Sequence, residues 1–230
     1  MSLMHPLFEP TPIKGVLFDF HSTLVDQGSS EEWLGTACNK VGLDPRDYDE
    51  ILPKLNSIVE FARIEDPDHE RDLSRRANEE IFTRLLSDFA EEPLTSALYS
   101  TMTESWRVYD DSLAVLDALQ EQGITTVIVS NIAHDLPAIA ERLGIAQSVN
   151  HIFTSAQLGY VKPNPEIFLA VAAAIEIHPA DLLMVGDNAI DDGGAGAVGI
   201  RTLILPRTSG PTHGLATVLG VIAGSQATSY

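Results

Sequence analysis

Five short runs of apolar, mostly β-branched residues recur along the chain, and their order restricts the fold more than any other feature. They lie at residues 13–18, 124–130, 151–154, 182–185 and 200–205. Each is a continuous hydrophobic run, as is typical of strands that are buried on both faces of a parallel sheet. Helical patterns separate the last four runs, so the sequence predicts an α/β fold with a doubly wound parallel sheet.

Residues 27–106 break this alternation, because they carry helical patterns and many charges but no convincing strand. Ser29 followed by Glu32 matches a capping box at the start of a helix. The run "DPDHERDLSRRANEE" is most simply explained as the solvated face of a helix. We therefore predict an all-helical insert at residues 27–106 and a core domain formed by residues 1–26 and 107–230.

Polar side chains follow four of the five predicted strands. Because ligands of parallel α/β sheets bind beyond the carboxyl ends of the strands, these residues are the natural candidates for a functional site. Each one alone has a simpler explanation, such as a turn or a helix cap, but together they predict one site at one edge of the sheet. They are, in strand order, Asp19 and His21, then Ser130 and Asn131, then Lys162, and finally Asp187, Asp191 and Asp192.

The stretch "GGAGAVG" matches the glycine spacing of a dinucleotide site. Its context argues against that function, since the glycines lie well past the fourth strand and no acidic residue follows Asp192 to bind a ribose. We expect this stretch to form a tightly packed helix that leads to the fifth strand.

The strand-end segments "FDFHSTL", "VIVSN", "VKPNP" and "VGDNAIDDGGAGAVGI" resemble the four sequential motifs of the haloacid dehalogenase superfamily. The resemblance spans residues 13 to 205, and the helical insert resembles the C1 cap of the branch that contains β-phosphoglucomutase and the dehalogenases. It implies a Rossmann-like core, a cap that selects the substrate and a hydrolase activity.

The resemblance also implies a role for each strand-end residue. Asp19 would attack phosphorus and form an aspartyl-phosphate, while Lys162, Ser130 and Asn131 would bind the phosphoryl oxygens. Mg²⁺ would be the cofactor. Its expected ligands are Asp19, the backbone carbonyl of His21, Asp187 and a second acid of the fourth motif, either Asp192, which we favour, or Asp191.

His21 departs from the pattern of the family's phosphatases, which resemble one another in having Asp at this position as the acid and base. An imidazole can transfer protons near neutral pH, so His21 is the expected, slower substitute. The predicted function is therefore a Mg²⁺-dependent phosphatase of a small phosphorylated metabolite. Two alternatives stay open: a metal-free 2-haloacid dehalogenase that uses Asp19, and a catalytically weak relative that only binds a phosphorylated ligand.

Several residues are candidates for selecting the substrate or for moving the cap. Gly28 and the segment near Trp106 are candidate hinges, and His134 either reaches the mouth of the site or starts a helix. The candidates for the lining of the site are Trp33, Trp106, Arg63, Arg75 and Arg76.

The charge of the chain limits its partners. It carries 33 acidic and 14 basic residues, a net charge of −19, which repels nucleic acids and anionic membranes. The start of the sequence lacks the pattern of a signal peptide, and no run reaches the roughly 18 apolar residues of a membrane span. We expect a cytoplasmic monomer or homodimer.

Overall fold

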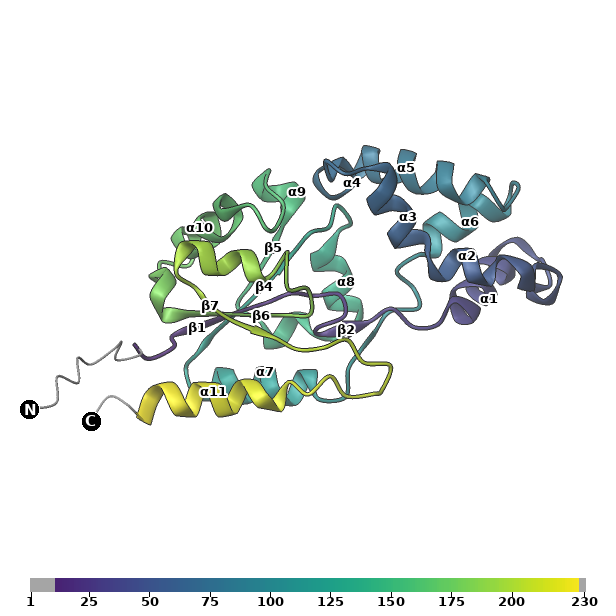
Figure 1. Ribbon diagram of the computed structural model, residues 1–230. Coiled ribbons are helices and arrows are strands. Elements are labelled where there is room, and N and C mark those ends of the chain that lie inside the picture. The colour runs from purple at the N-terminus through teal and green to yellow at the C-terminus, as the bar shows by residue number, and fades with distance from the viewer. Residues whose placement is uncertain (1–10, 228–230) are drawn as a thin grey trace, which may run out of the picture.

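A five-stranded parallel sheet forms the core of the molecule (Figure 1). The computed structural model describes residues 11–227, and all five predicted strands are confirmed, each with small shifts at its ends or none. The sheet order is β5-β4-β1-β6-β7, with every neighbouring pair parallel. The strands are β1 (Gly15–Phe18), β4 (Thr125–Ser130), β5 (His151–Thr154), β6 (Leu182–Gly186) and β7 (Arg201–Ile204).

Helices cover both faces of this sheet, so the predicted Rossmann-like α/β architecture is confirmed. On one face, Val16 and Phe18 of β1 pack with residues of α7 (Ser112–Glu121), α8 (Leu136–Arg142) and α11 (Ala216–Ala227). On the other face, Leu17 packs with α10 (Pro165–Ala174), which follows the short helix α9 (Ser155–Leu158). Full burial of each such side chain contributes about 1.5–3 kcal/mol, which explains why the strand is apolar at consecutive positions. Two short 3-10 helices, η2 (Ala146–Ser148) and η3 (Pro179–Asp181), complete these connections.

The insert folds into helices around a hydrophobic cluster of its own. The buried residues of this cluster all lie between Trp33 and Tyr99, and none of them belongs to the sheet. The predicted capping box is present, since the Ser29 side chain accepts the Glu32 N–H and Glu32 accepts the Ser29 N–H. The elements are α1 (Ser30–Val41), η1 (Pro45–Ile51), α2 (Leu52–Asn56), α3 (Ile58–Glu65), α4 (Glu70–Leu73), α5 (Arg75–Ser87) and α6 (Leu94–Thr101).

The charged run in the insert is not simply a solvated helix face, so that expectation is wrong in part. The Arg71 side chain is only 4% exposed. It forms ion pairs with Asp66 at 3.0 Å and with Asp72 at 3.1 Å, which compensate the buried charge. Sequence patterning missed this network because buried ion pairs and solvated charges have the same composition.

A short antiparallel ribbon joins the insert to the core. The outgoing chain forms β2 (Val25–Asp26), and it pairs with β3 (Arg107–Val108) of the returning chain. Gly28 follows with a φ of 72°, and a Cβ at this position would lie 2.4 Å from the Ser105 carbonyl oxygen. The two linkers therefore lie so close together that only glycine fits at position 28.

The glycine-rich stretch forms the predicted helix, the 3-10 helix η4 (Gly193–Val198), which leads to β7. A Cβ on Gly194 would lie 2.6 Å from the side chain of Pro163, so the close packing expected of this stretch is present. Across the part of the chain that the structure describes, no helix is long and apolar enough to cross a membrane.

Candidate active site

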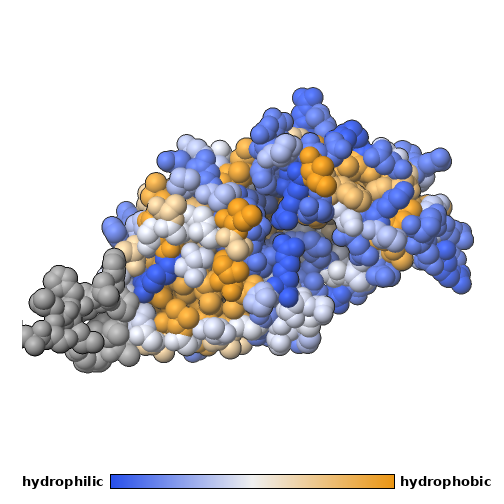
Figure 2. Space-filling view, in the orientation of Figure 1, coloured by the Kyte–Doolittle hydropathy of each residue, from blue (hydrophilic) through white to orange (hydrophobic). Residues whose placement is uncertain are grey.

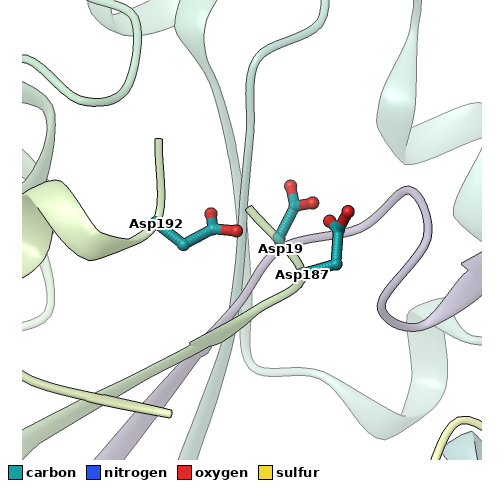
Figure 3. A group of neighbouring side chains, drawn as sticks. All are labelled: Asp19, Asp187 and Asp192. Carbon is teal, nitrogen blue, oxygen red and sulfur yellow. The ribbon is translucent and has the colours of Figure 1, made fainter. Parts of the chain in front are cut away.

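Three carboxylates meet at the carboxyl edge of the sheet (Figure 3). Asp19 directly follows β1, Asp187 directly follows β6, and Asp192 directly precedes η4. One oxygen from each lies within 4.8 Å of the others. Because β1 and β6 are parallel and hydrogen-bonded neighbours, their ends place Asp19 and Asp187 side by side.

Lys162 compensates the negative charge of two of these carboxylates. Its buried Nζ donates hydrogen bonds to Asp19 Oδ1 at 2.8 Å and to Asp192 Oδ1 at 2.7 Å. Burial alone would lower the pKa of Lys162, but the two carboxylates outweigh burial and raise it, so the ammonium stays charged. Burial raises the pKa of Asp19 and Asp192, and Lys162 opposes that rise.

Asn131 holds the backbone on which Lys162 stands. Its Nδ2 donates to the Lys162 carbonyl at 2.9 Å, and its Oδ1 accepts the Lys162 N–H at 2.8 Å. Both ends of the amide are therefore engaged, and the geometry favours positioning of Lys162 over the predicted contact with phosphate. Ser130 ends β4 and lines the same cavity.

The structure separates the two candidate acids of the fourth motif. Asp192 belongs to the acidic group, but both of its oxygens accept hydrogen bonds, one from Lys162 and one from the Asn188 N–H at 2.9 Å. Asp191 lies outside that group and accepts from Asn188 Nδ2 at 2.7 Å. A Cβ on Gly186 would lie 2.0 Å from Asp192 Oδ2, so the glycine of this motif leaves room for the Asp192 carboxylate.

Asp187 has a partner that sequence reasoning missed. Arg207, in the loop after β7, donates a hydrogen bond from Nε to the Asp187 carboxylate. The Asp187 side chain is 2% exposed, whereas that of Arg207 is 60% exposed. The polar residues were sought after only four strands, and the same search after the fifth strand would have found Arg207.

His21 lies in the site without a strong partner. Its Nδ1 is 3.5 Å from Gln27 Nε2, and its buried Nε2 has no hydrogen-bond partner among residues 11–227. Its ring lies 5.0 Å from that of Trp106. Burial, with the nearby charges of Arg207 and Arg63, lowers the pKa of His21 to about 4, so its imidazole is neutral at pH 7.

A cavity of about 180 Å³ lies between the core and the insert, and Figure 2 shows the surface hollowed there, with hydrophilic side chains at the rim. A single water needs only about 15 Å³, so there is room for more than a phosphoryl group. All eight strand-end candidates line it, together with Trp33, Trp106 and Arg63. Arg75 and Arg76 do not: Arg76 pairs with Glu80 at 2.7 Å, and Arg75 Nη1 lies 3.3 Å from His134 Nδ1.

His134 lines the cavity and precedes α8, whose N-cap is Asp135. Burial and then Arg75 lower its pKa to about 4, below the reference value near 6.5.

The lowered pKa of His134 predicts a dependence of stability on pH. Between pH 6.5 and pH 4 the unfolded chain binds a proton at His134 and the folded chain does not, so we expect the free energy of unfolding to decrease as the pH falls through this range. Urea unfolding measures the free energy of unfolding at pH 7.5 and pH 5.5. The decrease between the two pH values should be smaller for His134→Gln than for wild type. Equal losses in the two proteins would contradict the assignment.

The donor set suits a hard divalent cation. Asp19 and Asp187 offer carboxylate oxygens on the side of the site away from Asp192, and the His21 backbone carbonyl follows in the same turn. Mg²⁺ prefers such oxygen ligands and usually keeps several waters. The residues therefore fit the predicted cofactor, with Asp19 and Asp187 as the side chains that would hold it.

A parallel sheet with an acidic edge, a buried lysine and a helical insert defines a class of α/β hydrolases. The model of the haloacid dehalogenase-like hydrolases matches residues 13–199, and the chain belongs to this family. It is therefore an enzyme, as predicted.

Individual relatives differ in their chemistry. The chain is 26% identical to (S)-2-haloacid dehalogenase 1 of Pseudomonas sp. (strain CBS-3), with 87% of each chain covered. It is 27% identical to a phosphoglycolate phosphatase of Rhodospirillum rubrum, with 84% of this chain and 79% of the relative covered. Among solved structures, a dehalogenase superposes with a TM-score of 0.69 at 20% identity, covering 92% of this chain and 97% of that one; this likeness supports the fold alone.

Proposed function

We propose that this enzyme is a Mg²⁺-dependent phosphatase that hydrolyses a small phosphorylated metabolite through a covalent intermediate on Asp19. The observation that carries the proposal is the placement of Asp19 between a charged Lys162 and the carboxylate of Asp187. A phosphoryl group needs positive charge on its oxygens, and a metal held by two carboxylates would supply it opposite the lysine. A haloacid has no phosphoryl oxygens, so it would not need both the Lys162 ammonium and a metal ion.

The residues divide the work as follows. Asp19 attacks phosphorus: its Oδ–P bond forms as the bond to the leaving oxygen breaks, and that oxygen takes a proton from water. A second water then adds to phosphorus, the Oδ–P bond breaks, and inorganic phosphate and the free Asp19 carboxylate are released. Lys162 and Ser130 hold phosphoryl oxygens, while Asn131 and Asp192 keep Lys162 in place. The metal, bound by Asp19, Asp187 and the His21 carbonyl, would neutralise charge on the transferred group.

We further propose that residues 27–106 act as a cap over residues 1–26 and 107–230. The separate hydrophobic cluster of the insert and the paired linkers at β2 and β3 support this division. The cavity between the two parts supports closure over the substrate, which would exclude water during phosphoryl transfer. A cytoplasmic location and a monomeric or homodimeric state stay predictions.

His21 provides the first test of the mechanism. With a pKa lowered to about 4, the His21 imidazole is neutral at pH 7 and is both a weak base and a weak proton donor to the leaving group. We expect His21→Asp to raise the turnover number about tenfold and His21→Ala to lower it, both measured as phosphate release under saturating Mg²⁺. Identical rates for the three proteins would show that this side chain takes no part in proton transfer.

Arg207 provides a second test, on metal affinity. Its guanidinium neutralises Asp187, so a cation that binds Asp187 must compete with it. Removing a charge-assisted hydrogen bond of this kind is worth about a tenfold change in affinity. We expect isothermal titration calorimetry to show tighter Mg²⁺ binding for Arg207→Gln than for wild type. Arg84→Gln removes the same charge from a residue that pairs with Glu65 outside the cavity, and it should leave the affinity unchanged.

The similarity to a 2-haloacid dehalogenase favours a second candidate, halide displacement by Asp19 without metal. One panel separates the possibilities: phosphate esters and 2-haloacids, each assayed with and without Mg²⁺. Phosphate release that requires Mg²⁺ and Asp19 supports the phosphatase, and halide release without metal supports the dehalogenase. Binding of phosphate esters without any turnover supports a relative that binds ligand only.

A further inference from the structure

The insert presents a group of hydrophobic side chains to the cavity. The seven are Trp33, Leu55, Ile58, Val59, Phe82, Met102 and Trp106. They face the core residues Asp19, Ser130 and Lys162, so the part of a substrate that points away from the phosphoryl group must lie against them. The chemistry of this surface therefore bears on the leaving group.

Several polar side chains of the insert that line the cavity are already engaged within the protein. Ser30 Oγ donates to Asn56 Oδ1 at 2.6 Å, and the indole Nε1 of Trp33 donates to the Leu98 carbonyl at 2.9 Å. Ser105 Oγ donates to the Gln27 carbonyl at 2.8 Å.

The same holds deeper in the insert. Asn78 donates to the Arg71 carbonyl at 3.1 Å and accepts from the Tyr99 hydroxyl at 3.0 Å. Arg71 is bound by Asp66 and Asp72, and Asp72 also contacts His69. These groups have little capacity left for a ligand.

Gln27, Ser29 and Arg63 keep some hydrogen-bonding capacity. Gln27 Nε2 is 3.5 Å from His21 Nδ1, and Ser29 Oγ accepts the Glu32 N–H. The Arg63 side chain is 38% exposed, and its carboxylate partner Glu60 is 3.9 Å away. These three polar side chains are outnumbered by the hydrophobic ones on the insert's side of the cavity.

From this distribution we infer that the substrate carries an apolar leaving group, an alkyl or aryl alcohol rather than a sugar or polyol; this inference rests on the proposed phosphatase function. A hydroxyl placed against the seven hydrophobic side chains loses its water without gaining a hydrogen bond in return. Each such loss costs roughly fivefold to 100-fold in affinity. A hydrocarbon chain in the same place gains from leaving water.

The test compares n-pentyl phosphate with ribitol 5-phosphate, two five-carbon primary esters that differ by four hydroxyl groups. We expect kcat/KM for phosphate release to be at least about tenfold higher for the pentyl ester. Binding is measured separately on Asp19→Asn, which cannot turn the esters over, through quenching of intrinsic fluorescence. The chain has two tryptophans, Trp33 and Trp106, and both line the cavity, so the signal reports on this site.

Two variants on one helix provide the matched control. Val59 and Ile64 both lie on α3 and are 37% and 69% exposed, but only Val59 lines the cavity. Val59→Asn should weaken binding of pentyl phosphate about fivefold or more and reduce the preference for it, whereas Ile64→Asn should leave both unchanged.

The outcomes separate this inference from the proposed function. Tighter binding of the pentyl ester supports the inference, even where no phosphate is released. Equal binding of the two esters, tighter binding of ribitol 5-phosphate, binding of neither, or equal effects of the two asparagine variants would overturn it. The absence of phosphate release from any ester counts against the phosphatase function alone.

Discussion

Replacing Asp19 by Asn is expected to reduce phosphate release at least about a thousandfold. The carboxylate supplies the electron pair that forms the bond to phosphorus, and an amide of the same shape has no comparable nucleophilicity. The same substitution removes one of the two negative charges that compensate the Lys162 ammonium, and the other, on Asp192, remains. Steady-state phosphate release under saturating Mg²⁺ measures the loss.

Asp181→Asn is the matched control, because Asp181 forms a surface ion pair with Lys14 far from the cavity lining. It removes the same charge and should leave turnover within about twofold of wild type. A mass increase of one phosphoryl group on wild type quenched during turnover, absent from Asp19→Asn, would identify the covalent intermediate. Turnover of Asp19→Asn at the rate of the control would disprove the nucleophilic role.

Lys162→Met is expected to have the second largest effect, on both stability and activity. The substitution leaves Asp19 and Asp192 buried next to each other without their shared cation. Breaking a buried ion pair by removing one partner costs about 3–5 kcal/mol, so urea unfolding should show a loss of this size. Phosphate release should fall at least about a hundredfold, because no cation remains at that phosphoryl oxygen.

A double variant separates the two effects. Lys162→Met combined with Asp192→Leu removes both charges of the buried Lys162–Asp192 pair, and apolar replacements of buried ion pairs are often well tolerated. We expect much of the lost stability to return while activity stays low. Recovery of activity together with stability would mean that Lys162 acts only by holding the fold together.

The fold was predictable because its three central strands, β1, β4 and β6, are buried on both faces, although the edge strands β5 and β7 are only partly buried. Residues such as Val16, Leu17 and Phe18 must all be apolar in a strand that helices cover on either side, and few other structures require such runs. The packing partner of η4 was not predictable from the glycine spacing, because Gly194 approaches Pro163, a residue from another segment.

The candidate site was predictable to the extent that it follows the strand ends. The rule that ligands bind at the carboxyl edge brought Asp19, Lys162 and Asp187 together correctly. The pairing of donors with acceptors depends on the direction of each side chain. The two hydrogen bonds between the Asn131 amide and the Lys162 backbone could therefore be found only from the structure. Whether a charged residue is solvated or buried, as with Arg71, likewise depends on packing that a single sequence does not encode in its pattern.

The ribbon of β2 and β3 makes the insert exchangeable. The chain leaves the core and returns to it at neighbouring, hydrogen-bonded residues, and the insert brings its own hydrophobic cluster. A different helical module could therefore be spliced between Asp26 and Arg107 without altering the sheet or the acidic edge. If the insert is the cap that we propose, the choice of substrate and the bond-breaking chemistry can evolve separately, each through changes in its own segment of the gene.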